Sequence, residues 1–280
     1  QSGLLFAPIK CSRLQLFLRF NKDGIMMKYI ILIIVLLSPS FSYALSQEET
    51  NTLIQKIDDR QRNSGDYKSL VYIEQKEKNK NDVVYQAVIY RRDDDDKLMI
   101  LFLKPQSDSG RGYLRLNKNL FSYDPAVGKW ERRTERENIG GTGSRRRDFD
   151  ESRYSEEYSA NFVGEEKLGK LDVYHIDLTA KPKVDVAYPI VKVWLDKQTG
   201  NLLKQQEFAL SGRLMRTSYY PKWNKMFSES KGADIYFPKE IRIYDEVEKG
   251  NQTTVLIEEV DLKSLDPNIF TKAWLESKSR

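Results

Sequence analysis

The stretch LDVYHIDL (residues 171–178) decides the fold class of this 280-residue chain. Its apolar and polar residues alternate with a period close to two, as in a β-strand with one face against a core. The same alternation recurs along most of the chain, and short turn signals such as Gly169, Lys197–Gly200 and Ser211-Gly212 separate the runs. Connections this short join neighbouring antiparallel strands. The sequence therefore predicts a mainly β protein built around one antiparallel sheet.

About eleven strands are expected. A sheet of that size has to curl and to cover its apolar face. The segment 139–160 breaks the pattern, because it is glycine-rich, then arginine-rich, then acidic and polar, and we expect a loop followed by a short helix. The candidate strands are 68–77, 83–91, 97–104, 111–117, 119–124, 129–134, 171–180, 190–196, 202–209, 213–220, 234–245 and 253–263.

One amphipathic helix precedes the strands. Ser46-Gln47-Glu48-Glu49 is a capping box, in which the serine and Glu49 satisfy each other's backbone amides. The helix should run for about four turns and end near Asn63-Ser64-Gly65. Leu53, Ile54 and Ile57 lie on one side of it and are candidates for a lid over the sheet.

Several strands have an apolar side that should face the interior. The polar positions between them, such as Arg115, Lys192 and Arg242, should face water. Periodicity does not distinguish a filled core from a ligand cavity, and a filled core is the commoner outcome. The candidates for lining such a cavity are Leu114, Leu116, Tyr174, Ile176, Leu178, Val191, Val193, Leu195, Ile241 and Ile243.

The first 44 residues have the pattern of a leader. Lys28 precedes the apolar run Ile30–Leu37, and small residues at Ser42 and Ala44 complete the pattern of a secretory signal peptide, for which we expect cleavage after Ala44. Met26-Met27-Lys28 resembles an ordinary start, so residues 1–25 are interpreted as an upstream extension, 26–44 as the signal peptide and 45–280 as a single domain. The residue after the cleavage site is not the cysteine that a lipid anchor needs. We therefore expect a soluble periplasmic protein.

The net charge and the cysteine and histidine counts exclude several classes of function. Residues 1–44 hold five of the 46 basic residues and one of the 41 acidic ones, so the remainder is close to neutral and gives no reason to expect nucleic acid. The only cysteine is Cys11 and the only histidine is His175, which falls in the strand-like run 171–178. These counts exclude a Cys/His zinc site and a disulfide framework. We expect no cofactor, no metal and no enzymatic activity.

Two motifs receive structural interpretations. The run Ile139–Arg147 lacks the Gly-Lys-Ser/Thr ending of a phosphate loop, so a mobile surface loop is the preferred interpretation. Asp93–Asp96 lacks the spacing of a calcium loop, and we expect a solvated hairpin tip there.

The order and spacing of several phrases resemble the outer membrane lipoprotein-sorting protein family, the relatives of the LolA/LolB carriers. The resemblance covers nearly all of residues 46–276. It departs at Arg145–Asp150, where relatives often carry a more apolar stretch containing Met and Phe, so a ligand-gating insertion is expected to differ. The phrases are Phe102–Pro105, Arg111–Leu114, Asn119–Pro125, Trp130, Arg147–Asp150, Val163–Glu166, Val173–Ile176, Val193–Lys197 and Asp266–Thr271.

The resemblance implies an incomplete, strongly curved antiparallel β-barrel with a helical lid over a hydrophobic cavity. It implies a periplasmic carrier, a chaperone for the acyl chains of lipoproteins or lipids in transport towards the outer membrane. Its partners would be the acylated cargo, an inner-membrane transporter of the ABC or RND type and an outer-membrane acceptor. Two alternatives stay open: a non-enzymatic periplasmic binding or sensor module, and an accessory protein of an RND-type lipid exporter.

Overall fold

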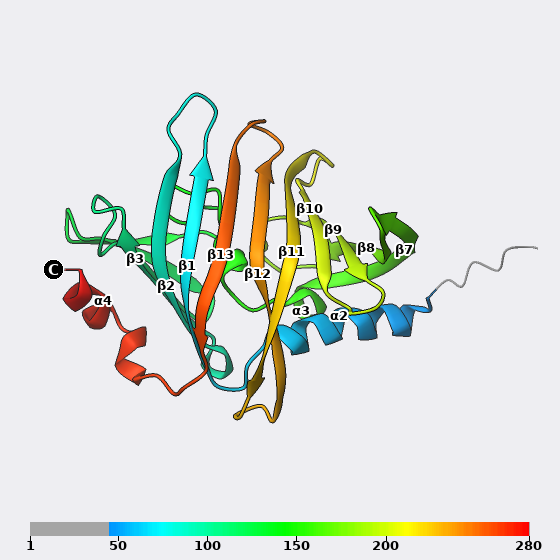
Figure 1. Cartoon of the computed structure of the whole chain (residues 1–280), viewed down its shortest axis with the longest axis horizontal. Helices are drawn as coiled ribbons and strands as arrows, with labels where there is room; N and C mark the ends of the chain where they lie inside the picture. The colour runs from blue at the N-terminus through cyan, green and yellow to red at the C-terminus, as the bar shows by residue number, and fades with distance from the viewer. Residues whose placement is uncertain (1–44, 280) are drawn as a thin grey trace, which may run out of the picture. The chain divides into compact units, whose positions relative to one another are not determined.

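The computed structural model describes residues 45–279. The expected upstream extension and signal peptide lie outside these described residues. Thirteen strands, rather than about eleven, form one antiparallel sheet in the order β6-β5-β4-β3-β2-β1-β13-β12-β11-β10-β9-β8-β7 (Figure 1). The strands are β1 (Asp66–Lys76), β2 (Val83–Arg92), β3 (Lys97–Lys104), β4 (Gly112–Leu116), β5 (Asn119–Asp124), β6 (Lys129–Arg133), β7 (Tyr158–Leu168), β8 (Leu171–Ala180), β9 (Ile190–Asp196), β10 (Leu202–Phe208), β11 (Leu214–Ser228), β12 (Ala233–Asp245) and β13 (Gln252–Asp261).

The strand order explains why one segment has to cross the sheet. The chain builds β1 to β6 towards one edge, restarts at β7 on the opposite edge and returns to β13, which pairs with β1. Residues 134–157, named here the crossover segment, connect the two edges. They contain the short helices η2 (Arg146–Asp148) and α3 (Tyr154–Glu157). The sheet is open, because β6 and β7 do not pair with each other.

Strand β7 was missed by the sequence analysis. It is an edge strand that pairs only with β8, and a register shift between Phe162 and Gly164 interrupts its alternation. Beyond that point most of its residues are exposed on both faces, so no apolar periodicity marks them. The expected short helix before it is confirmed as α3.

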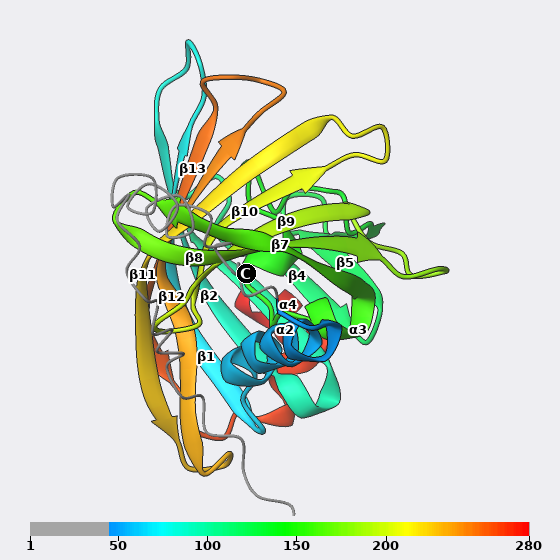
Figure 2. The same ribbon diagram turned by 90° about the vertical axis from the view of Figure 1, so that its right-hand side faces the viewer.

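Helix α2 (Gln47–Gln61) forms as predicted. Ser46 N donates to Glu49 Oε2 over 2.8 Å, and Glu49 N donates to Ser46 Oγ over 3.2 Å, which confirms the capping box. Figure 2 shows α2 and α3 on the inner side of the sheet. Ile54 and Ile57 are buried there, in one core cluster with residues from both halves of the sheet.

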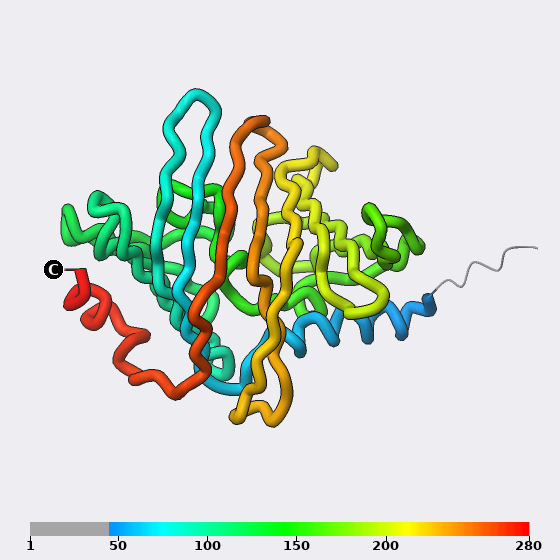
Figure 3. Tube along the Cα trace, in the orientation of Figure 1, coloured from blue at the N-terminus to red at the C-terminus, as the bar shows by residue number. Residues whose placement is uncertain are grey.

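A second, smaller core lies on the other face. After β13 the chain runs through the short helices η3 (Pro267–Phe270) and α4 (Lys272–Lys278) (Figure 3). Ser279 Oγ then donates to the Gly110 carbonyl, between β3 and β4, over 2.5 Å. The turn η1 (Asp93–Asp95) joins β2 to β3. Met99, Leu101 and Leu114 pack under Phe270 and Leu275. Both faces of β3 and β4 are therefore buried.

Candidate functional site

Most of the predicted lining residues meet in one apolar cluster. It joins strands β8, β9 and β12 to Ile54 and Ile57 of α2, and Ile54 is only 1% exposed. Tyr174 is half-buried at its border, and Leu53 is half-buried outside it. The predicted lining residues that belong to this cluster, named here the apolar site, are Ile176, Leu178, Val191, Val193, Leu195, Ile241 and Ile243.

Leu114 and Leu116 do not join the apolar site. They lie on the opposite face of β4, in or against the core under α4. Their neighbours point inward instead: Tyr113 belongs to the main core, and Arg115 is 3% exposed rather than facing water as expected. The reason is that α4 covers the outer face, so alternation alone could not tell which side of β4 was the interior.

The glycine-rich part of the crossover segment is packed against the sheet. It does not form the expected surface loop: Ile139 and Ser144 are fully buried. A Cβ on Gly141 would lie 2.4 Å from Tyr85 Oη, so only glycine allows this approach. Gly143 N donates to Gln75 Oε1 over 2.8 Å. The glycines therefore allow close packing.

Asp150 is the centre of a buried ionic cluster. Arg115 Nε lies 3.0 Å from Asp150 Oδ2, and Arg115 Nη2 donates to Oδ1 over 3.0 Å. Arg146 also pairs with Asp150, and its Nε lies 2.9 Å from Glu135 Oε1. Burial alone would raise the pKa of Asp150, but the guanidinium groups of Arg115 and Arg146 lower it to about 2. This carboxylate is therefore ionised.

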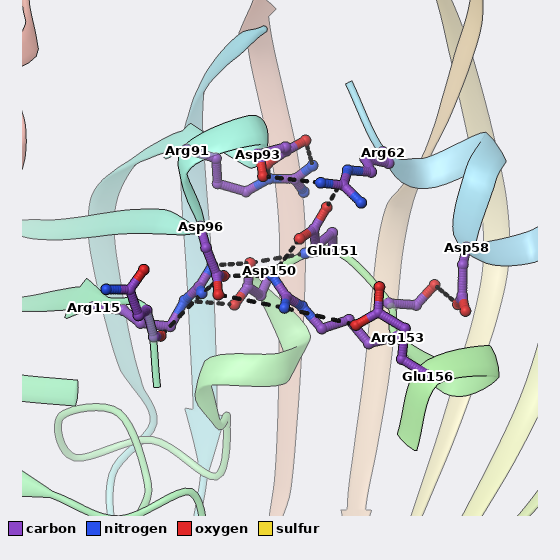
Figure 4. A network of polar contacts seen from close by, with 12 residues as sticks. Asp58, Arg62, Arg91, Asp93, Asp96, Arg115, Asp150, Glu151, Arg153 and Glu156 are labelled. Atoms are coloured by element: carbon purple, nitrogen blue, oxygen red, sulfur yellow. Dashed lines mark hydrogen bonds and ion pairs between the residues drawn. The ribbon is translucent and has the colours of Figure 1, made fainter. Parts of the chain in front are cut away.

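The acidic run Asp93–Asp96 contributes to the same cluster. It is not a solvated tip: Asp93 is 2% exposed and accepts from Arg91 Nε and Nη2 over 2.9 and 2.7 Å. Asp96 has a φ of 56° and pairs with Arg115 and Arg153. Only the two middle residues of the run are exposed. Figure 4 shows these side chains gathered around Asp150 and Glu151.

Asp58 attaches helix α2 to the crossover segment. Its carboxylate accepts from Ser152 Oγ at 2.6 Å, Tyr154 N at 3.1 Å, and Ser155 N and Oγ at 2.7 and 2.6 Å. Asp58 lies on α2, and the donors flank the start of α3. The helix and the crossover segment are thereby joined by four hydrogen bonds to one side chain.

A second ionic group lies further along the interior. Arg216 Nη2 lies 2.5 Å from Asp148 Oδ2, and Arg216 Nη1 lies 3.3 Å from Glu207 Oε2. Gln205 Nε2 donates to Glu207 Oε1 over 2.8 Å, and Gln205 Oε1 accepts from Tyr154 Oη over 2.5 Å. Burial raises the pKa of Glu207. The interior is thus apolar beneath α2 and strongly polar along the crossover segment.

A small cavity lies between the apolar and the ionic parts of the interior. Its volume is about 50 Å³. Arg91 and Asp150 line one part of it, and Val71, Ile89 and Ile241 line another. This is room for a few water molecules, far less than the roughly 300–1,000 Å³ of a pocket that holds a small-molecule ligand. In this structure the crossover segment and α2 fill the interior.

His175 lies on β8, as predicted, among side chains distinct from the main core. Its ring stacks on Trp194 with centroids 4.4 Å apart, and Nδ1 lies 2.7 Å from Glu166 Oε1. A hydrogen bond from Trp194 Nε1 is the main reason why the pKa of Glu166 is lowered.

Two features are absent from the described residues. Between residues 45 and 279, no group of three or more His, Cys, Asp or Glu side chains is placed to hold a metal ion. Within the same range, none of the helices is long and apolar enough to cross a membrane.

The arrangement defines a fold class: an open antiparallel sheet whose apolar face is covered by an N-terminal helix. Solved structures share this fold. A LolA superfamily protein from Nitrosomonas europaea has a TM-score of 0.68 and 19% identity over 80% of this chain and 98% of its own. A domain of an outer membrane lipoprotein-sorting protein from Vibrio parahaemolyticus has a TM-score of 0.71 and 18% identity over 82% and 100%.

A third structure, a DUF1329 family protein from Desulfovibrio piger, has a TM-score of 0.72 and 18% identity over 81% of this chain and 98% of its own. No curated protein matches the sequence. A family model with the description "Uncharacterized protein" matches residues 94–277, and the chain belongs to that family. The resemblance to the lipoprotein-sorting family is confirmed for the fold.

Proposed function

We propose that this protein is a soluble periplasmic carrier that shields the acyl chains of a lipoprotein or lipid and delivers them towards the outer membrane. The observation that supports this most directly is the cover of the apolar site. Helix α2 contributes only two fully buried apolar side chains to it, Ile54 and Ile57. An acyl chain in the place of these two side chains would give the apolar site a similar apolar cover, although the hydrogen bond from Gln47 Nε2 to the Ala160 carbonyl of β7 would be lost.

The energetics require a carrier that opens. Each buried methylene contributes about 0.8 kcal/mol, so a sixteen-carbon chain is worth roughly 10 kcal/mol when shielded from water. The cavity of about 50 Å³ beside the crossover segment has no room for such a chain. In the proposal α2 acts as the lid of a strongly curved half-barrel, and acyl chains displace it. Refilling of the site by Ile54 and Ile57 then favours release.

The proposed carrier role requires a donor and an acceptor of the cargo. Cargo would arrive from an inner-membrane transporter of the ABC or RND type and leave to an outer-membrane acceptor. The mechanism is non-enzymatic: the side chains act by packing and exclusion of water, and the single histidine stacks on Trp194.

Native mass spectrometry tests the proposal. The protein is expressed from the full chain and purified from a bacterial periplasm without detergent. We expect extra mass that organic extraction removes and identifies as acylated. Val193→Asp, at a fully buried position of the apolar site, should lose this mass, whereas Val163→Asp, which changes a 49% exposed strand residue, should keep it. Circular dichroism verifies that both variants fold. A clean apo mass, with no uptake of an added acyl probe, would contradict the proposal.

The filled interior favours one second candidate, a periplasmic binding or sensor module that uses its outer surface for a protein partner. Such a module needs no cavity, and the ion pairs of the crossover segment would then only stabilise the fold. It predicts an apo mass together with a stable complex with an envelope protein. An accessory of an RND-type exporter would instead retain lipid and depend on that exporter.

A further inference from the structure

Arginine side chains contact the Asp150 carboxylate in the way that they would contact a bound anion. Its carboxylate comes from the crossover segment, not from the sheet, and its side chain is completely buried. Arg115, on strand β4, approaches it through Nε and Nη2 at 3.0 Å each, and Arg146 approaches from the crossover segment itself. Two guanidinium groups on one carboxylate form the arrangement by which proteins bind anionic oxygen groups.

Asp150 contributes one negative charge to this cluster. Five arginines take part in the cluster, and besides Asp150 there are five acids, each paired with an arginine. Burial lowers the pKa of Arg115, the negative charge of Asp150 raises it, and the positive charges of Arg146 and Arg153 lower it. An anion that replaced Asp150 with a single negative charge would leave the net charge of the cluster unchanged. The arginines are Arg62, Arg91, Arg115, Arg146 and Arg153, and the five acids are Asp93, Asp96, Glu135, Glu151 and Glu156.

The same place continues into an apolar surface. Asp150 and Arg91 line the small cavity whose other walls include Val71, Ile89 and Ile241. All three of these side chains belong to the main core and are nearly fully buried. If the Asp150 side chain moved away, a charged group in its place at Arg115 and Arg146 would therefore have an apolar surface directly beside it.

From this geometry we propose that the arginine cluster is a headgroup site for a lipid with one negative charge on oxygen, a carboxylate or a phosphodiester. The carboxylate of Asp150 is a tethered competitor that occupies the site until such a lipid displaces it. The lipid tail then lies along the apolar walls of the widened cavity. This proposal rests on the carrier function and narrows its cargo to anionic lipids.

Asp150→Asn tests the proposal by removing the competing charge with almost no change in shape. Three probes with the same acyl chain are compared: a fatty acid, a phosphatidylglycerol and an uncharged monoacylglycerol. We expect the affinity for at least one anionic probe to rise by about tenfold, the scale of one charge-assisted contact, and the affinity for the uncharged probe to stay the same. Asp124→Asn, which alters an exposed partner of Arg111, is the matched control and should change neither.

Equal gains for charged and uncharged probes would overturn the headgroup site, and so would no gain for either probe when acetate and dimethyl phosphate also leave the melting temperature of Asp150→Asn unchanged. The comparison between fatty acid and phosphatidylglycerol identifies the headgroup. Acetate and dimethyl phosphate, which carry no chain, separate this proposal from the carrier function. If they raise the melting temperature of Asp150→Asn and not of Asp124→Asn while no lipid binds, the headgroup site stands and the carrier function fails.

A measurement on the unmodified protein covers the case in which Asp150→Asn does not fold. Amide hydrogen exchange is followed with and without each lipid probe. An anionic lipid should speed exchange in residues 145–153, because it displaces Asp150 from the arginines, whereas the uncharged lipid should leave these residues unchanged. Saturable binding of an anionic lipid with unchanged exchange in this segment would overturn the proposal.

Discussion

The two parts of the interior are held by opposite kinds of contact. Beneath α2, Ile54 and Ile57 pack against the apolar site, and such contacts depend on area and shape. Along the crossover segment, Asp150 and its arginines form matched, directional pairs. An apolar side chain can be exchanged for another apolar group at small cost, whereas a buried charge that loses its partner is strongly destabilising. The apolar part is therefore suited to exchange with any apolar group, whereas the ionic part holds one arrangement unless another anion takes the place of Asp150.

Removal of one ionic partner should have the largest effect. Arg115→Met leaves the carboxylate of Asp150 short of a partner in the interior, and we expect a loss of about 3–5 kcal/mol in the free energy of unfolding, measured with urea. Arg111→Met, which breaks partly exposed pairs, should cost no more than about 1 kcal/mol. Similar losses in the free energy of unfolding for the two variants would show that the buried ion pairs contribute no more to stability than the surface pairs do.

Truncation of a buried side chain on α2 or on β8 should lower the stability of the protein in both cases. The two truncations should change the affinity for an acyl probe in opposite directions. Ile57→Ala on α2 and Ile176→Ala on β8 each remove a buried side chain, with an expected loss of about 2–5 kcal/mol. The helix variant should bind a fluorescent acyl probe more tightly, because the closed state is weakened. The strand variant should bind it less tightly, because the lining is lost. Changes of the same sign would refute α2 as an exchangeable cover.

Acid should weaken the ionic part through Asp150. Its pKa is about 2 in the folded protein and 3.8 as an ordinary value, so its stabilising effect is complete above about pH 4. That effect, about 2 kcal/mol, is lost as the pH falls from about 4 through 2. The difference in unfolding free energy between the wild type and Asp150→Asn should shrink across this range, since all other carboxylates are common to both. A difference that stays constant would contradict the assignment.

The smallest effect should come from the backbone of the crossover segment. Gly141→Ala places a methyl group 2.4 Å from Tyr85 Oη and should cost about 1–3 kcal/mol. Gly164→Ala has no heavy atom within 4 Å of the new methyl group and should stay within about 0.5 kcal/mol. Thermal unfolding measures both. Equal melting temperatures for the two variants would mean that close packing of the glycine-rich run on the sheet does not stabilise the protein.

Local patterns predicted the elements well. The capping box and the spacing of Ile54 and Ile57 are properties of neighbouring residues, and α2 begins and packs as they indicate. Alternation located twelve of the thirteen strands, because a half-buried strand records its two faces in its own residues. The exception, β7, is an edge strand with little burial along its second half.

The burial of the charged residues in the ionic cluster could not be predicted from their neighbours in the sequence. Nothing local distinguishes Arg115, which is buried beside Asp150, from an arginine on a solvated strand face. The same holds for Asp93, whose partners include Arg91 and the backbone amide of Asn63. A charge run usually faces water, and it lies inside only when another segment brings the opposite charges to it.

By itself, the sequence determined an antiparallel sheet, a capped amphipathic helix and an apolar face, because each depends on the period of neighbouring side chains. Only the tertiary structure decided what fills the interior. Strands β6 and β7 lie at opposite edges, so the crossover segment has to traverse the sheet, and its charges are buried where the strands supply partners. Helix α4 likewise decides which face of β4 is the interior. Both outcomes depend on long-range packing, which residue periodicity does not encode.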